Sequence, residues 1–181
     1  LYVLSYDVTP TADLEVSVSY SGGGGAPNDI KVKVEIDNDA IDEVNEQEDL
    51  DLIPIPSSVY TATSFDVTIP KGQKTATIKF SLKPDQFDLS EAYGLGLKIT
   101  NVTGTDAVLS GNFYRMVLNI GAKNPYDGLY NYKSAANQSL NASANQNDAE
   151  LITTGANTVR TYLVNTYANQ VTYSIDPTTF K

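Results

Sequence analysis

The segment spanning residues 30–73 constrains the fold more than any other part of this 181-residue chain. Apolar and polar residues alternate over residues 30–36, which is the period of a strand with one buried face. A short acidic stretch follows, and Pro54 and Pro56 prevent a helix there from continuing. A second alternating run ends at the turn Pro70-Lys71-Gly72, where glycine supplies a positive φ. This order predicts a β-sandwich that carries one inserted helix.

Alternating runs also predict strands in the rest of the first 120 residues. With the first strand, they are residues 14–20, 30–36, 65–69, 75–82, 95–99 and 113–120. About seven short strands separated by turns are typical of an antiparallel sandwich of two sheets. We therefore expect an all-β chain with an immunoglobulin-like antiparallel β-sandwich and a short acidic helix.

The helix is predicted from the acidic stretch that follows the first of these runs. Side-chain oxygens of residues 37–39 can cap its N-terminus. Ile41 and Val44 lie three residues apart and can both pack inward. The glutamates expected to face solvent are Glu43, Glu46 and Glu48. We expect this helix of one to three turns to close an open end of the sandwich.

The charge balance changes near residue 122, which indicates two domains. Residues 1–122 hold 18 acidic and 8 basic side chains, a net charge of −10, whereas residues 123–181 hold 4 of each. Strand-like runs continue in the second part, between turn sequences rich in Gly, Asn and Asp. We predict a sandwich domain over 1–122 and a small C-terminal β-meander over 123–181, whose completeness the sequence leaves open.

Composition excludes several functions. A net charge of −10 argues against binding to nucleic acid, which requires clustered Lys and Arg. The chain contains no His and no Cys. The side chains that most often serve in acid–base catalysis, in thiol chemistry and as ligands of soft metals are therefore absent. No run of about 18 apolar residues could form a transmembrane helix. We therefore predict that the protein is not an enzyme and needs no cofactor.

A calcium site is one alternative for the acidic stretch. Calcium prefers about six to eight oxygen ligands, and several such side chains lie close together here. The candidates are Asp37, Asp39, Asp42 and Glu43, with Asn38 between them. Their spacing lacks the glycine and the terminal Glu of an EF-hand loop. We favour the interpretation that these acidic residues cap the helix and form its solvated face.

Tyrosines of the second part suggest carbohydrate binding. Binding sites commonly combine aromatic faces with a few polar groups that fix orientation. The candidate residues are Tyr126, Tyr130, Tyr132, Tyr162, Tyr167 and Tyr173. Tyrosine is also common on half-exposed strands. A structural or protein-interaction module without a small-molecule ligand therefore stays an equal alternative.

An ordered set of motifs carries a family resemblance. The motifs are Val34-Glu35-Ile36-Asp37, the helical residues 40–45, Leu52-Ile53-Pro54 with Tyr60, residues 67–73 and residues 93–99. In this order they resemble the domain of unknown function 1735, found in exported Bacteroidetes proteins. That family has Tyr-x-Leu-Pro before its last motif, where Gly94 and Gly96 stand here, and we expect this departure to lie at a strand edge. Residues 125–130 and 171–177 look like the small β-domain that often follows.

The resemblance implies a non-catalytic cell-surface lipoprotein or module associated with glycan binding or uptake. The implied partner is an oligosaccharide or another cell-surface protein. The implied location is the outer membrane or cell surface, with a lipid anchor upstream of residue 1 and the periplasm as the alternative. The family has no established catalytic residues.

Overall fold

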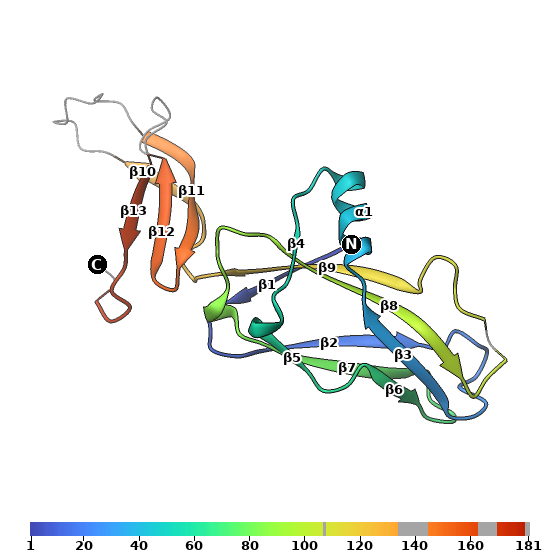
Figure 1. The fold of residues 1–181 in the computed structure, drawn as a ribbon. Helices are drawn as coiled ribbons and strands as arrows, with labels where there is room; N and C mark the ends of the chain where they lie inside the picture. The colour runs from blue at the N-terminus through green and yellow to red at the C-terminus, as the bar shows by residue number, and fades with distance from the viewer. Residues whose placement is uncertain (107, 134–144, 163–169, 180–181) are drawn as a thin grey trace. The chain divides into compact units, whose positions relative to one another are not determined.

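The computed structural model describes residues 1–181 except 107, 134–144, 163–169 and 180–181. The chain forms two compact units, Leu1–Gly121 and Ala122–Lys181, both built mainly of strands (Figure 1). This division lies one residue from the domain boundary predicted after residue 122, and the assignment of the two parts as separate domains stays a prediction. The predicted all-β fold class is confirmed.

Two sheets form the first unit. In spatial order, the larger sheet contains β1 (Tyr2–Asp7), β9 (Arg115–Lys123), β8 (Tyr93–Thr103), β3 (Ile30–Ile36) and β6 (Asp66–Ile69), with β4 (Ile53–Pro54) also beside β8. The smaller sheet contains β2 (Ala12–Ser19), β7 (Thr75–Leu82) and β5 (Tyr60–Ala62). The β2–β7, β5–β7, β3–β6, β3–β8 and β8–β9 pairs are antiparallel, whereas β4 runs parallel to β8.

The core lies between the inner faces of these sheets. Alternate residues of β2, β7 and β3 are buried, as the sequence pattern predicts for strands with one covered face. Phe80 is 1% exposed and contacts the Tyr60 and Phe65 rings at centroid distances of 6.1 and 5.9 Å. These aromatic contacts add to the apolar burial that holds the two sheets together.

The strand predicted over residues 113–120 begins later than expected. β9 starts at Arg115, and the Phe113 side chain is 83% exposed. The hydroxyl of Ser110 accepts hydrogen bonds from the backbone N–H groups of Asn112 and Phe113 at 3.4 and 3.2 Å. Because these bonds hold the segment in a turn, its apolar residues cannot continue the ladder.

Helix α1 (Asn38–Glu48) lies on the outer face of the larger sheet, over β8 and β9 (Figure 1). Ile41 is fully buried, as predicted, and packs with Ala40, Leu52 and Val117. The prediction that this helix closes an open end of the sandwich is wrong. The outward positions of β8 beneath Ile41 are glycines, so the sheet offers a recess that an apolar helix face can fill.

Gly94 and Gly96 supply that recess. A Cβ atom on Gly94 would lie 3.0 Å from a methyl group of Ile41, and one on Gly96 would meet the carbonyl oxygen of Asp37. β8 pairs with β3, β4 and β9, so these glycines lie inside the sheet. The expectation that they lie at a strand edge is therefore wrong. They provide the surface of β8 against which α1 packs.

Other helix residues follow the predicted pattern only in part. Val44 was expected to be buried, but it is only partly buried and lies at the margin of the cluster around Ile41. Glu46 and Glu48 are exposed. Glu43 is also exposed, yet it is not free in solvent because its carboxylate pairs with Arg115.

The second unit is a four-stranded antiparallel meander. Its strands are β10 (Gly128–Lys133), β11 (Asn145–Gly155), β12 (Thr158–Tyr162) and β13 (Gln170–Ser174), in sequence order across the sheet. Asn124 is 2% exposed, and its side-chain amide donates to the carbonyl oxygens of Gly155 and Thr158 at 2.8 and 2.9 Å. This buried amide ties the start of the unit to its β11–β12 turn. No helix among the described residues is long and apolar enough to cross a membrane.

Candidate functional site

The acidic residues at the start of α1 form an ion-pair network. Asp37 occupies the N-cap position, as predicted, but its carboxylate makes no capping hydrogen bond. It is 3% exposed and pairs with Lys98 at 3.3 Å and Arg115 at 3.1 Å. The prediction of side-chain capping by Asp37 is wrong because β8 and β9 present these two cations beneath the helix.

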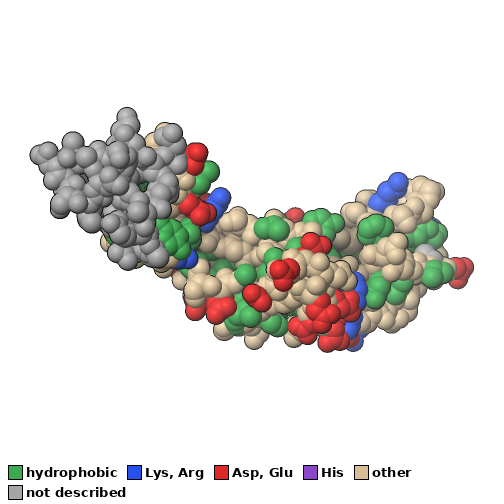
Figure 2. All heavy atoms as spheres, turned by 90° about the horizontal axis from the view of Figure 1, so that it is seen from above, with side chains coloured by type: hydrophobic (Ala, Val, Ile, Leu, Met, Phe, Trp, Pro, Cys, Tyr) green, Lys and Arg blue, Asp and Glu red, His purple; other side chains and the backbone are tan. Residues whose placement is uncertain are grey.

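Arg115 extends this network to the exposed side of the helix. Its guanidinium donates to both carboxylate oxygens of Glu43, at 2.9 and 3.0 Å. The hydrogen bond to Glu43 and the charge of Asp37 raise the pKa of Arg115 above its ordinary value. Figure 2 views the molecule from the side that carries α1 and shows acidic side chains gathered next to basic ones. The network fastens α1 to the sheet.

The four candidate calcium ligands therefore do not converge on one site. Asp37 and Glu43 face Arg115, whereas Asp39 and Asp42 are exposed. Among the described residues, no three acidic side chains come close enough together to hold a metal ion. The ion pairs with Lys98 and Arg115 give Asp37 and Glu43 a structural role that does not require a metal ion.

The predicted carbohydrate-binding tyrosines are partly accessible. Tyr130, Tyr162 and Tyr173 are 43%, 53% and 42% exposed, and Tyr126 is half-buried. Tyr132 belongs to β10, but its side chain lies outside the described residues, as does the whole of Tyr167.

Strand register shows which of these rings share a face. Tyr173 pairs with Val159, which in turn pairs with Thr153. Tyr130 pairs with Ala149, on the same side of β11 as Thr153 because the two are four residues apart. Tyr162 is three residues from Val159 on β12 and therefore points to the opposite face.

Tyr130 and Tyr173 are not neighbours on their common face. Two strands separate β10 from β13, which places the rings about 14 Å apart across the sheet. The register adds about 13 Å along the strands. The two rings cannot stack on one sugar residue. The face between them is covered, since Thr153 and Val159 are 6% and 1% exposed and the Thr153 hydroxyl is hydrogen-bonded to Asn124 and Asp127, so a ligand would contact the two rings at separate margins of this face.

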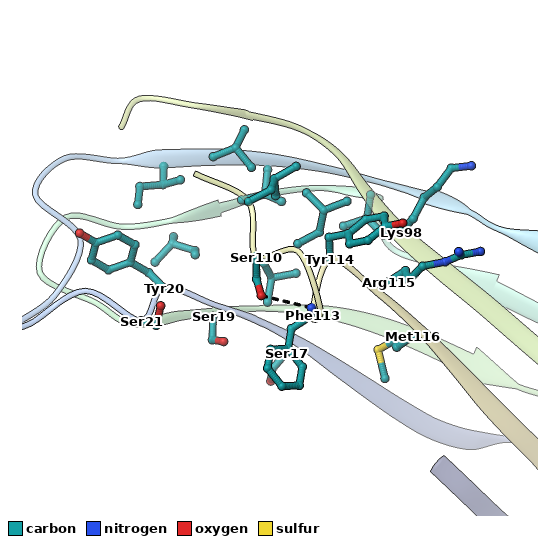
Figure 3. A pocket seen from close by; sticks show the side chains of 18 of the residues that line it. Ser17, Ser19, Tyr20, Ser21, Lys98, Ser110, Phe113, Tyr114, Arg115 and Met116 are labelled. Carbon is teal, nitrogen blue, oxygen red and sulfur yellow. Dashed lines mark hydrogen bonds between the residues drawn. The ribbon is translucent and has the colours of Figure 1, made fainter. Parts of the chain in front are cut away.

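A cleft in the first unit is a candidate site that the sequence did not reveal. It has a volume of about 500 Å³ and lies between β2 and the start of β9 (Figure 3). Its floor is made of inward-facing aliphatic side chains such as Val32, Ile78 and Leu97. Its rim carries Val108 and Phe113 of the β8–β9 loop, which are 91% and 83% exposed. The sequence pattern predicted a strand that included Phe113, so it gave no signal for this cleft.

Together these features define an all-β protein with an immunoglobulin-like sandwich and a small β-meander. Residues 1–106 match the family model described as "-like, N-terminal domain". The match covers more than half of the chain, and the chain belongs to this family. A comparison with curated proteins gives no match.

Solved structures from Bacteroides share the fold. A protein of unknown function from Bacteroides ovatus superposes with a TM-score of 0.69 at 20% identity, over 97% of this chain and 60% of its own. An auxiliary nutrient binding protein from Bacteroides thetaiotaomicron gives 0.64 at 14% identity, over 96% and 66%. A multidomain protein of Bacteroides ovatus that includes the domain of unknown function 1735 gives 0.63 at 16% identity, over 91% and 56%.

One further structure is an enzyme. EndoBT-3987 of Bacteroides thetaiotaomicron, with Man5GlcNAc product, gives a TM-score of 0.55 at 14% identity, over 67% of this chain and 28% of its own. At these identities the likeness shows the fold alone. The chain spans less than two thirds of the length of each of these four structures.

Proposed function

We propose that this chain is a non-catalytic module of an exported cell-surface protein, and that it takes part in glycan binding or uptake. The observation that carries the proposal is the pair of accessible rings, Tyr130 and Tyr173, on one face of the second unit. The fold likeness to a nutrient binding protein and to EndoBT-3987 with its glycan product supports it. The likeness to the multidomain protein supports membership of the family of the domain of unknown function 1735.

The chemistry of the second unit suits an uncharged ligand. Residues 123–181 hold 4 acidic and 4 basic side chains, so the unit has no net charge to select an ionic partner. Tyrosine offers an apolar ring face together with a hydroxyl that can donate or accept a hydrogen bond. Sugars present apolar C–H faces and hydroxyls, which match both parts of this side chain. The proposed location is the outer surface of the cell, with a lipid anchor upstream of residue 1.

Truncating either ring is expected to weaken oligosaccharide binding. Tyr130→Ala and Tyr173→Ala should each lose about 1–3 kcal/mol of binding free energy if ring–sugar stacking is similar in scale to ring–base stacking. Isothermal titration calorimetry with an oligosaccharide bound by the unmodified chain measures this loss.

Tyr162→Ala is the matched control, because Tyr162 is at least as exposed as the other two rings and belongs to the same sheet, but lies on the opposite face. It should leave affinity within about 0.5 kcal/mol of the original value. Equal losses in all three variants, or losses that accompany a lower melting temperature, would assign the tyrosines a structural role instead.

A protein-interaction module is the second candidate function. The specific observation that favours it is the aliphatic cleft beside β2, whose rim exposes Val108 and Phe113. Large apolar side chains gathered at an exposed site often mark a surface that another molecule covers.

A further inference from the structure

β2 is an edge strand of the smaller sheet. Within the part of the chain that the structure describes, it pairs with β7 on one side and with no strand on the other. The backbone N–H of Tyr20 donates to the carbonyl oxygen of Lys74 at 2.8 Å, which continues the β2–β7 register. Hydrogen-bonded pairs alternate along an antiparallel ladder, so the residues that bond to β7 are Val18 and Val16. The backbone groups of the residues between them point to the free edge.

That free edge is the wall of the cleft. Residues 16–22 all line it without interruption (Figure 3 labels several of them), and Tyr114, Arg115 and Met116 line it on the side of β9. Side chains of one strand alternate between two faces, so one face alone cannot supply consecutive residues. An unbroken run indicates that the cleft follows the backbone edge of β2. The cavity therefore offers both an aliphatic floor and a row of hydrogen-bonding groups.

We propose that β2 and this cleft accept an extended segment of a partner protein as an added β-strand. The backbone of the segment pairs with the N–H and C=O groups of Glu15, Ser17 and Ser19. Every second side chain is apolar and enters the cleft, where the floor is aliphatic. The intervening side chains lie on the outer face of the sheet with Asp13 and Glu15. These intervening side chains are basic, because the charged side chains of β2 are the acids Asp13 and Glu15, of which Glu15 also pairs with Lys79 at 2.9 Å.

The free backbone edge of β2 and the aliphatic floor of the cleft together favour an extended peptide over other ligands. A small apolar ligand would fill the floor but would leave the β2 edge without hydrogen bonds. A sugar could bond to the edge, but it has no side chain to fill an aliphatic cavity of about 500 Å³. Only an extended peptide satisfies both features at once.

Peptide titration against the full chain tests the proposal. The probe is an eight-residue peptide that alternates Val and Lys, labelled with a fluorophore for anisotropy. Three controls have the same length: Val alternating with Glu, the Val and Lys residues separated into two blocks, and the alternating peptide with N-methylated backbone amides. The alternating Val–Lys peptide should bind at least tenfold more tightly than each control. Binding of the N-methylated peptide with equal affinity, or no detectable binding of the probe, would overturn the proposal.

Two measurements locate the binding site. Ser17→Pro removes one N–H from the free edge without removing a bond to β7, whereas Ser17→Ala keeps that N–H. The proline variant should lose at least tenfold in affinity and the alanine variant less than twofold. In the unmodified chain, the bound peptide should slow hydrogen exchange at Glu15, Ser17 and Ser19 at least tenfold, which requires no variant to fold. Unchanged exchange at all three amides would overturn the assignment to β2.

Discussion

Replacing Gly96 with Ala is expected to lower the free energy of unfolding by about 3 kcal/mol or more. The new methyl group would meet the backbone carbonyl oxygen of Asp37 and would lie 3.3 Å from a side-chain carbon of Ile41. A backbone atom cannot rotate away as a side chain can, so α1 would have to lift from β8. Its apolar contacts with Val117 would be lost together with the ion pairs beneath its first turn.

Urea unfolding followed by circular dichroism measures this change. Gly121→Ala is the matched control because Gly121 also lies in a strand, has no positive φ and has no neighbouring atom within 4 Å of an added Cβ. That control should be nearly silent or slightly stabilising. If Gly96→Ala also left the free energy of unfolding unchanged, α1 would not pack closely against β8.

Replacing Asp37 with Asn should cost about 2–3 kcal/mol of stability. The substitution keeps the shape of the side chain but removes the negative charge that compensates Lys98 and Arg115. Both cations are partly exposed, so the cost is smaller than for a fully buried pair. The same urea titration gives the value.

Asp42→Asn is the control for this prediction, because Asp42 lies on the same helix but is exposed. Its effect should stay within about 0.5 kcal/mol. A double-mutant cycle between Asp37→Asn and Arg115→Gln should show a coupling of at least about 1 kcal/mol. Strict additivity of the two substitutions would mean that the pair contributes nothing to the docking of α1.

The strands were predictable because their pattern is local. Alternation on β2, β7 and β3 follows directly from a pleated strand with one covered face, and the observed burial has the same period. The turn at Gly72 was also readable, since that residue adopts the positive φ of 81° that glycine allows. Both features depend on neighbours in the sequence and on no distant contact.

The position of α1 was not predictable from the helix itself. Its apolar residues require a surface to cover, but they do not say which one. That surface is set by Gly94 and Gly96, more than 50 residues after Ile41, and the meaning of these glycines appears only when β8 lies beneath the helix. In the same way, Asp37 is a good capping residue locally, but Arg115 lies 78 residues away and takes its carboxylate.

The two candidate sites, the tyrosines and the cleft, also differ in how far the sequence predicts them. Tyr130 and Tyr173 could be identified as candidates from residue type, but only the register shows that they share a face and that Tyr162 does not. The cleft could not be predicted at all, because it arises where the free edge of β2 lies opposite the start of β9. The sequence pattern placed Phe113 in a strand, and only the structure shows that its side chain is exposed at the rim of the cleft.

Binding of the full chain to an immobilised oligosaccharide array tests the proposed function most directly. We expect binding to at least one class of glycan, with the same pattern for Tyr162→Ala and loss of that binding in the Tyr130→Ala/Tyr173→Ala double variant. The double variant should keep the circular dichroism spectrum of the unmodified chain, since both rings are exposed. Absence of binding to every glycan by the folded, unmodified chain, or undiminished binding by the double variant, would contradict the proposed role of these tyrosines in glycan recognition.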